Sequence, residues 1–88
     1  MSHVHVTRYR PGKNGEVRDA VAQVAAAISE VDGVISSRVF GDHSHVILIT
    51  EFEKWAVLDS FEGNDAIRSA LPPLARAEDG RGEFWFGQ

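Results

Sequence analysis

The stretch "VILITEF", in the middle of the chain, constrains the fold more than any other segment. Alternate side chains of a β-strand point to opposite faces of a sheet, so Val46, Leu48 and Phe52 share one face. Ile47 and Ile49 share the other. A sheet with one face in water alternates apolar and polar residues. Both faces of this strand are apolar, so we expect both to be covered.

The residue pattern on either side of this strand predicts a mixed α+β fold. Alternation predicts strands, and apolar residues three or four positions apart predict helices. The expected strands are residues 3–9, 34–40, 45–52 and 83–88, and the expected helices are residues 16–31, 54–61 and 66–70. With the two short helices counted as one region, the order is β-α-β-β-α-β. This order predicts the ferredoxin-like split βαβ arrangement with a four-stranded antiparallel sheet.

The first helix is the most regular segment of the sequence. Its apolar residues form a stripe with helical spacing: Val17, Ala20, Val21, Val24, Ile28 and Val31. Asn14 is a candidate N-cap, and Gly33 suits the left-handed position after a helix. We expect Pro72 and Pro73 to interrupt the last helix, because the second proline lacks a donor and restricts the residue before it.

Length and charge narrow the classes of function. Eighty-eight residues predict a single domain, residues 1–88, and the absence of cysteine excludes disulfides and thiolate sites. A net charge of −4 and scattered basic residues argue against a nucleic-acid partner. No apolar segment approaches the roughly 20 residues of a membrane span, and the polar N-terminus does not resemble a signal peptide. We therefore expect a cytoplasmic protein with no membrane partner.

The strand "VILITEF", which is apolar on both faces, also predicts a homodimer. Two helical regions can cover only one face of a four-stranded sheet, and the other face needs a second layer. The same face of a second subunit supplies that layer most simply. A chain this short buries a small fraction of its surface, which favours the dimer. The alternative is that both faces belong to the core of a monomer.

The sequence resembles a known family along nearly its whole length. A first strand reading "HVHVTRYRPGK", a long helix ending "EVDGV" and a later strand reading "ITEFEKWAVLDSF" are similar to the dimeric α/β-barrel superfamily, and within it to antibiotic biosynthesis monooxygenase (ABM) domains. The related stress-responsive A/B-barrel proteins are also similar. The resemblance implies a homodimeric α/β barrel with a pocket between sheet and helices in each subunit. It implies a small apolar or aromatic ligand and no cofactor.

Three functions remain open. One is a cofactor-independent monooxygenase that acts on an aromatic or quinone-like substrate and uses the substrate's own electrons to activate oxygen. The second is a non-catalytic stress-response or ligand-binding protein whose pocket is small or filled. The third is a structural dimer module that regulates a partner. The helix "DAIRSAL" lacks the histidine that haem-degrading members use as an iron ligand, so haem ligation has no support.

The same resemblance suggests the residues of the site. His5 occupies a first-strand position where related enzymes place a polar pocket residue, so it would assist proton transfer as the catalytic group. Tyr9, Phe52, Trp55 and Phe61 would line the substrate pocket. Phe52 and Phe61 stand where many members have tryptophan and histidine, respectively. Large aromatic residues in a small domain also commonly form core, and that interpretation remains open for these four.

Four histidines form two pairs, His3 with His5 and His43 with His45. The pairs begin the first and third expected strands. We expect these strands to be parallel neighbours, which would bring the four imidazoles together. Two histidines at i and i+2 share a face, as a metal site requires, yet no carboxylate pattern completes a ligand set. We expect no metal and interpret the pairs as residues at the rim of the sheet, hydrogen-bonded to one another or to Asp42.

Overall fold

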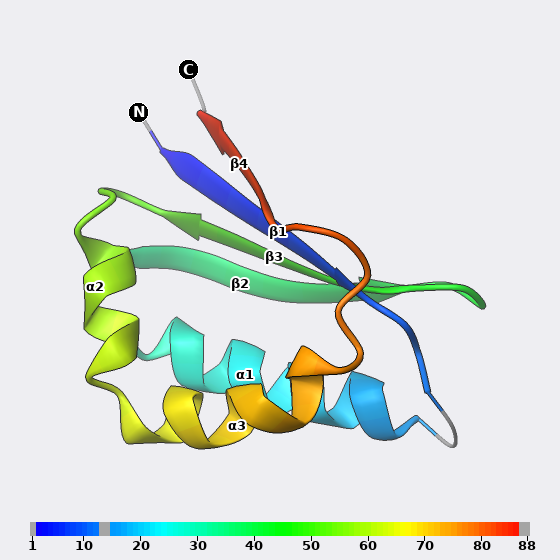
Figure 1. Cartoon of the computed structure of the whole chain (residues 1–88). Coiled ribbons are helices and arrows are strands. Elements are labelled where there is room, and N and C mark those ends of the chain that lie inside the picture. Colours follow the sequence, from blue (N-terminus) through cyan, green and yellow to red (C-terminus); the bar gives the residue numbers. More distant parts are fainter. Residues whose placement is uncertain (1, 13–14, 87–88) are drawn as a thin grey trace.

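The structure, a computed structural model, describes residues 2–12 and 15–86 of the chain. Its elements follow the expected order, with the second helical region divided into two helices (Figure 1). They are β1 (His3–Tyr9), α1 (Glu16–Ser29), β2 (Val34–Gly41), β3 (Val46–Phe52), α2 (Val57–Glu62), α3 (Asp65–Ala75) and β4 (Glu83–Phe86). The predicted ferredoxin-like α+β class is confirmed.

The four strands form one sheet in the order β2-β3-β1-β4. Each neighbouring pair is antiparallel, and the sheet does not close on itself. Helices α1 and α3 lie on the same side of the sheet, α2 lies at one end of it, and the opposite face carries no helix (Figure 1). None of the helices in the described part of the chain is long and apolar enough to cross a membrane.

The core lies between α1 and the sheet. Val21 and Val24, from the predicted stripe, are completely buried and pack with Leu48 of β3. Gly33 ends the helical segment with a φ of +90°, and a Cβ there would lie 2.6 Å from Cγ2 of Val57. The left-handed position predicted for this glycine is therefore confirmed. The candidate N-cap Asn14 lies outside the described residues.

Helix α3 corrects one prediction, because it continues to Ala75 through both prolines instead of breaking at them. A proline removes a backbone donor, but its fixed φ of about −65° is itself a helical value. Leu74, one residue beyond the prolines, is buried in the core. We attribute the continuation of the helix to this anchor, which holds the last turn in place.

The helix-free face of the sheet carries apolar side chains, as the middle strand predicts. Register pairs Val6 of β1 with Ile49 of β3, and both point away from the helices. Phe40 and Trp85, at the two outer strands, share this face and are 46% and 59% exposed. An apolar surface of this kind marks an interaction site in many proteins. We call it the open face.

Candidate functional site

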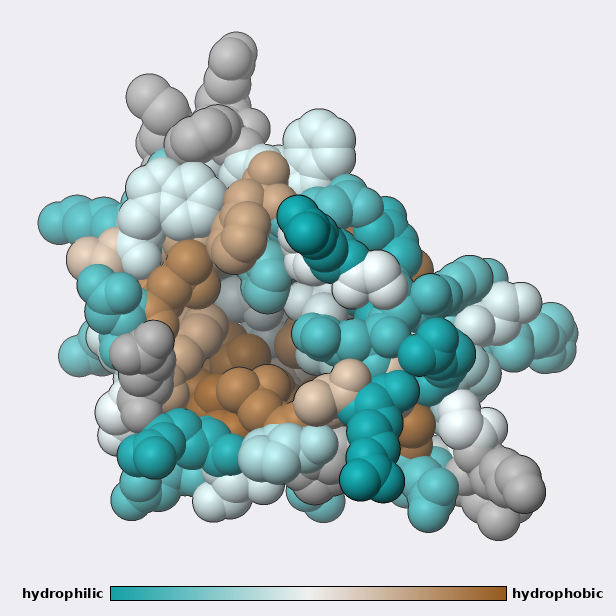
Figure 2. Space-filling view, viewed as in Figure 1, coloured by the Kyte–Doolittle hydropathy of each residue, from teal (hydrophilic) through white to brown (hydrophobic). Residues whose placement is uncertain are grey.

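The candidate site is a cavity of about 250 Å³ between the sheet and the helices. Helix α1 packs against β2 and β3, whereas α3 packs chiefly against α1. The space between α3 and β1 is therefore only partly filled. Figure 2 shows the resulting hollow, with apolar residues at its base and polar residues around it. Ile67 and Leu71 form the α3 wall, and Phe61 of α2 lines it as well.

The sheet wall of the cavity is unusually polar. His5, Thr7 and Tyr9 alternate along β1 and all face the helices, while Thr50 lines the cavity from β3. Thr50 is almost completely buried, and its hydroxyl group lies 3.2 Å from that of Ser37. Convergent polar groups in an otherwise apolar cavity are typical of sites that orient a small ligand.

His5 is held at the cavity wall by three neighbours. Its Nε2 lies 3.4 Å from Oγ1 of Thr7, and its ring stacks on Phe84 with centroids 4.4 Å apart. A Cβ at Gly82 would lie only 2.5 Å from Nε2, so a larger residue there would require the imidazole to shift. Burial lowers the pKa of His5, and the negative charge of Glu78 partly opposes that effect. The imidazole is therefore neutral at physiological pH and able to accept a proton.

Tyr9 reaches the cavity from the end of β1 and is only 3% exposed. Burial raises its pKa, the charge of Glu78 raises it further, and a hydrogen bond with Thr7 acts in the opposite direction. The phenol therefore stays protonated and can donate a hydrogen bond to a ligand. Tyr9, suggested above as a pocket residue, thus lies in the cavity wall.

The structure places Phe52 and Trp55 beside the cavity instead of in its wall. Phe52 is completely buried, with its ring centroid 5.5 Å from that of Trp55. The ring centroid of Trp55 lies 4.4 Å from that of His3 and 5.3 Å from that of Phe84. Phe84 belongs to this aromatic cluster and also stacks on His5, the candidate catalytic residue, so it joins the cluster to the site. Of the five suggested residues, His5, Tyr9 and Phe61 line the cavity.

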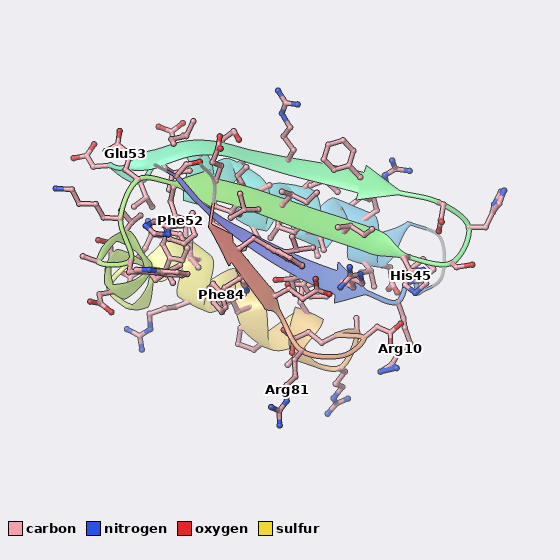
Figure 3. All side chains as sticks on the ribbon, turned by 90° about the horizontal axis from the view of Figure 1, so that it is seen from above. Arg10, His45, Phe52, Glu53, Arg81 and Phe84 are labelled. Carbon is pink, nitrogen blue, oxygen red and sulfur yellow. The ribbon has the colours of Figure 1, made fainter. Side chains whose placement is uncertain are left out.

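The two histidine pairs lie at opposite ends of the sheet, so the prediction of a four-histidine group is wrong. β1 and β3 are antiparallel, and His3 pairs with Phe52. Figure 3 shows Phe52 and His45 at opposite ends of β3. His45 instead places Nε2 3.2 Å from a carboxylate oxygen of Asp79, and its backbone N–H donates to Asp42. Within residues 2–12 and 15–86, no group of three or more potential ligands forms a metal site.

Sequence reasoning missed Thr50 and Glu78. Thr50 carries a weak signal, because it is the one polar residue on the helix-facing side of "VILITEF". Glu78 carries none, since it lies in the loop between α3 and β4. That loop reaches the cavity by pairing with β1: an isolated bridge joins Glu78 to Tyr9, and the Arg10 N–H donates to the carbonyl of Ala77 at 2.6 Å.

The similarity of this chain to known proteins lies in its fold. No family model matches the sequence, and no curated protein matches it. SnoaB, a cofactor-independent oxygenase from Streptomyces nogalater, matches the structure with a TM-score of 0.83 and 11% identity, over 99% of this chain and 93% of that chain. The chain has an ABM-like fold. The resemblance seen in the sequence is confirmed at that level.

Two further structures agree. A candidate antibiotic biosynthesis monooxygenase from Chloroflexus aurantiacus J-10-fl has a TM-score of 0.78 and 14% identity, over 100% of this chain and 94% of that chain. A conserved protein from Methanosarcina mazei Go1 has a TM-score of 0.78 and 17% identity, over 96% and 88% of the respective chains. Identities this low show the common fold, and the function must be argued from the site.

Proposed function

We propose that this ABM-like protein is a cofactor-independent monooxygenase for an aromatic or quinone-like substrate. The observation that carries the proposal is a neutral, partly buried His5 in the wall of an apolar cavity that also holds the Tyr9 phenol. An apolar cavity suits a planar ring, and a positioned imidazole suits removal of a proton from it. SnoaB, which shares the fold, is a cofactor-independent oxygenase.

In the proposed reaction, His5 takes a proton from a ring carbon activated by a neighbouring carbonyl or hydroxyl group. The carbanion formed reduces dioxygen with its own electrons. One oxygen atom enters the substrate and converts the CH₂ group into C=O, and the second leaves as water with the two hydrogens. Tyr9, protonated because its pKa is raised by burial, donates a hydrogen bond to the substrate oxygen that gains negative charge.

The proposal includes a homodimer that buries the open face. Val6 and Ile49 lie at the middle of that face, and Phe40 and Trp85 expose large apolar side chains beside them. Isologous pairing of two such faces would cover all of them at once. The helix-side cavity lies on the other side of the sheet, so pairing leaves its contents unchanged.

Ligand binding without catalysis is the second candidate, and the size of the cavity favours it. At about 250 Å³, the cavity is slightly smaller than the ~300–1,000 Å³ of typical small-molecule sites. A protein of this kind would use the same residues to hold an aromatic molecule, and His5 would act only as a hydrogen-bonding group.

Oxygen consumption in the absence of added metal or cofactor separates the two candidates. We expect turnover of anthrones by the wild-type protein, with product oxygen derived from ¹⁸O₂. His5→Gln should lower kcat by about 100-fold or more, the usual contribution of a positioned base. His43→Gln is the matched control, because His43 is exposed in the β2–β3 turn. Saturable binding with no oxygen uptake would reject the monooxygenase and support the ligand-binding protein.

A further inference from the structure

Glu78 is the one acidic side chain among the described residues that line the cavity, and its backbone is firmly placed. The N–H of Arg10 donates to the carbonyl before it, and the N–H of Asp79 donates to the carbonyl of Arg8 at 2.8 Å. The Arg10 guanidinium also donates to the Glu78 carbonyl at 3.1 Å. The loop is thus tied to β1 on both sides of Glu78, which fixes the backbone of this exposed residue beside the cavity that it lines.

The carboxylate of Glu78 acts on both polar groups of the sheet wall. Burial lowers the pKa of His5 and raises that of Tyr9, and the charge of Glu78 raises both. An effect on both residues places the negative charge close to the imidazole and the phenol. Any ligand that reaches these two groups therefore also lies in the field of Glu78.

No cation balances that charge within the cavity. Neither lysine nor arginine is among its described lining residues. The two arginines of this region are directed elsewhere: Arg8 pairs with Glu83 on the open face, and Arg10 bonds to carbonyl groups of the loop. His5 is neutral, as argued above. The site therefore combines apolar walls, neutral donors and one carboxylate, with no cationic side chain among its described lining residues.

This combination discriminates between ligands by charge. A carboxylated ring in the cavity would bring a second negative charge close to Glu78, an exposed residue of the cavity lining, and the two like charges repel. A hydroxylated neutral ring would instead donate a charge-assisted hydrogen bond to the same carboxylate. We propose that Glu78 is a specificity-determining residue that selects uncharged hydroxyaromatic ligands and rejects carboxylated ones. The inference rests on the proposed function only in taking this cavity as the ligand site.

The test compares two probes that differ in charge and little in shape, methyl 6-hydroxy-2-naphthoate and 6-hydroxy-2-naphthoate. Their affinities are measured by calorimetry at pH 7.5, and ring resonances of His5 report that binding occurs in the cavity. We expect the wild-type protein to bind the neutral ester at least about tenfold more tightly, as like-charge repulsion requires. Glu78→Gln should reduce that ratio to about twofold by strengthening the binding of the acid and weakening that of the ester.

Asp79→Asn is the matched control. It removes one negative charge from the adjacent residue, whose carboxylate pairs with His45 and does not line the cavity. Its affinity ratio should equal that of the wild type. A ratio unchanged by Glu78→Gln, or changed equally by Asp79→Asn, would overturn the role of Glu78. Neither result bears on the oxygenase reaction, which is judged by oxygen uptake. Failure of both probes to perturb His5 would reject the inference together with the ligand site.

Discussion

At the residue scale, the position of His5 explains how a small domain holds a neutral base. Thr7 and His5 share one face of β1, Phe84 stacks on the ring, and Gly82 lets the loop approach Nε2. These contacts remove water from the imidazole, and loss of water disfavours its charged form. The burial that keeps His5 neutral, and so able to accept a proton, should also make the folded state less stable at acidic pH.

The pH dependence of stability tests this interpretation. The folded-state pKa of His5 lies below its unfolded value of about 6.5, so the unfolded chain binds the proton more readily. Stability should be complete above pH 6.5 and fall as the pH decreases from there towards the folded-state pKa. Urea denaturation at pH 7.5 and pH 5.5 measures the loss. Between these pH values, His5→Gln should lose less free energy of unfolding than the wild type, and His43→Gln should lose as much as the wild type. An equal loss in all three proteins would argue against a buried neutral His5.

At the element scale, α3 forms the outer wall of the cavity although two prolines lie in its last turns. It begins with a side-chain cap, because Oδ1 of Asn64 accepts a hydrogen bond from the Ile67 N–H at 3.2 Å. It ends with the buried side chain of Leu74. A helix that is fixed at both ends can carry Leu71 over the cavity without packing closely against the sheet.

Removing the cap should loosen that wall. We expect Asn64→Ala to lower the free energy of unfolding by about 0.5–2 kcal/mol, the usual cost of losing a side-chain cap. It should also weaken binding of the neutral naphthoate ester, because Ile67 and Leu71 line the cavity from α3. Asn64→Asp keeps the acceptor and should preserve both properties. Ser69→Ala, at an exposed position in the middle of α3, is the control for a change that leaves the cap intact.

At the scale of the whole molecule, the sheet has two faces with different roles. The face towards the helices carries the polar cavity wall, including His5, Thr7 and Thr50. The open face carries Val6 and Ile49 at its centre and is the proposed dimer interface. Because the two faces use alternate residues of the same strands, a change on one face can be made without altering the side chains of the other.

Ile49→Glu tests the dimer directly. The wild-type protein should have twice the chain mass of 9.7 kDa in size-exclusion chromatography with light scattering. The substitution should give a monomer, because it would place two buried carboxylates in the interface of the two copies. Circular dichroism should show retained secondary structure. Ala22→Glu, on the exposed surface of α1, should remain dimeric. A wild-type mass of 9.7 kDa at micromolar concentration would contradict the dimer.

The sequence determined the elements, because their signals are local. The alternation in β1 and the apolar stripe of α1 follow from periods of two and 3.6 residues. The position of Gly33 at the end of the first helix follows equally from its freedom to adopt a positive φ. These features, with the β-α-β-β-α-β order, led to the fold class, whereas His5, Tyr9 and Phe61 were suggested as pocket residues by the resemblance to ABM domains.

Only the tertiary structure decided what met in space. The antiparallel direction of β3 relative to β1 placed the histidine pairs at opposite ends of the sheet. No residue period encodes that direction, and the expected parallel pairing conflicted with the antiparallel sheet of the predicted fold class. The buried side chain of Leu74 overrode the local preference of two prolines. Pairing of the loop with β1 brought Glu78 to the cavity across more than sixty residues of chain. Contacts between distant segments depend on packing, whereas sequence periodicity reports only which neighbours along the chain share a face.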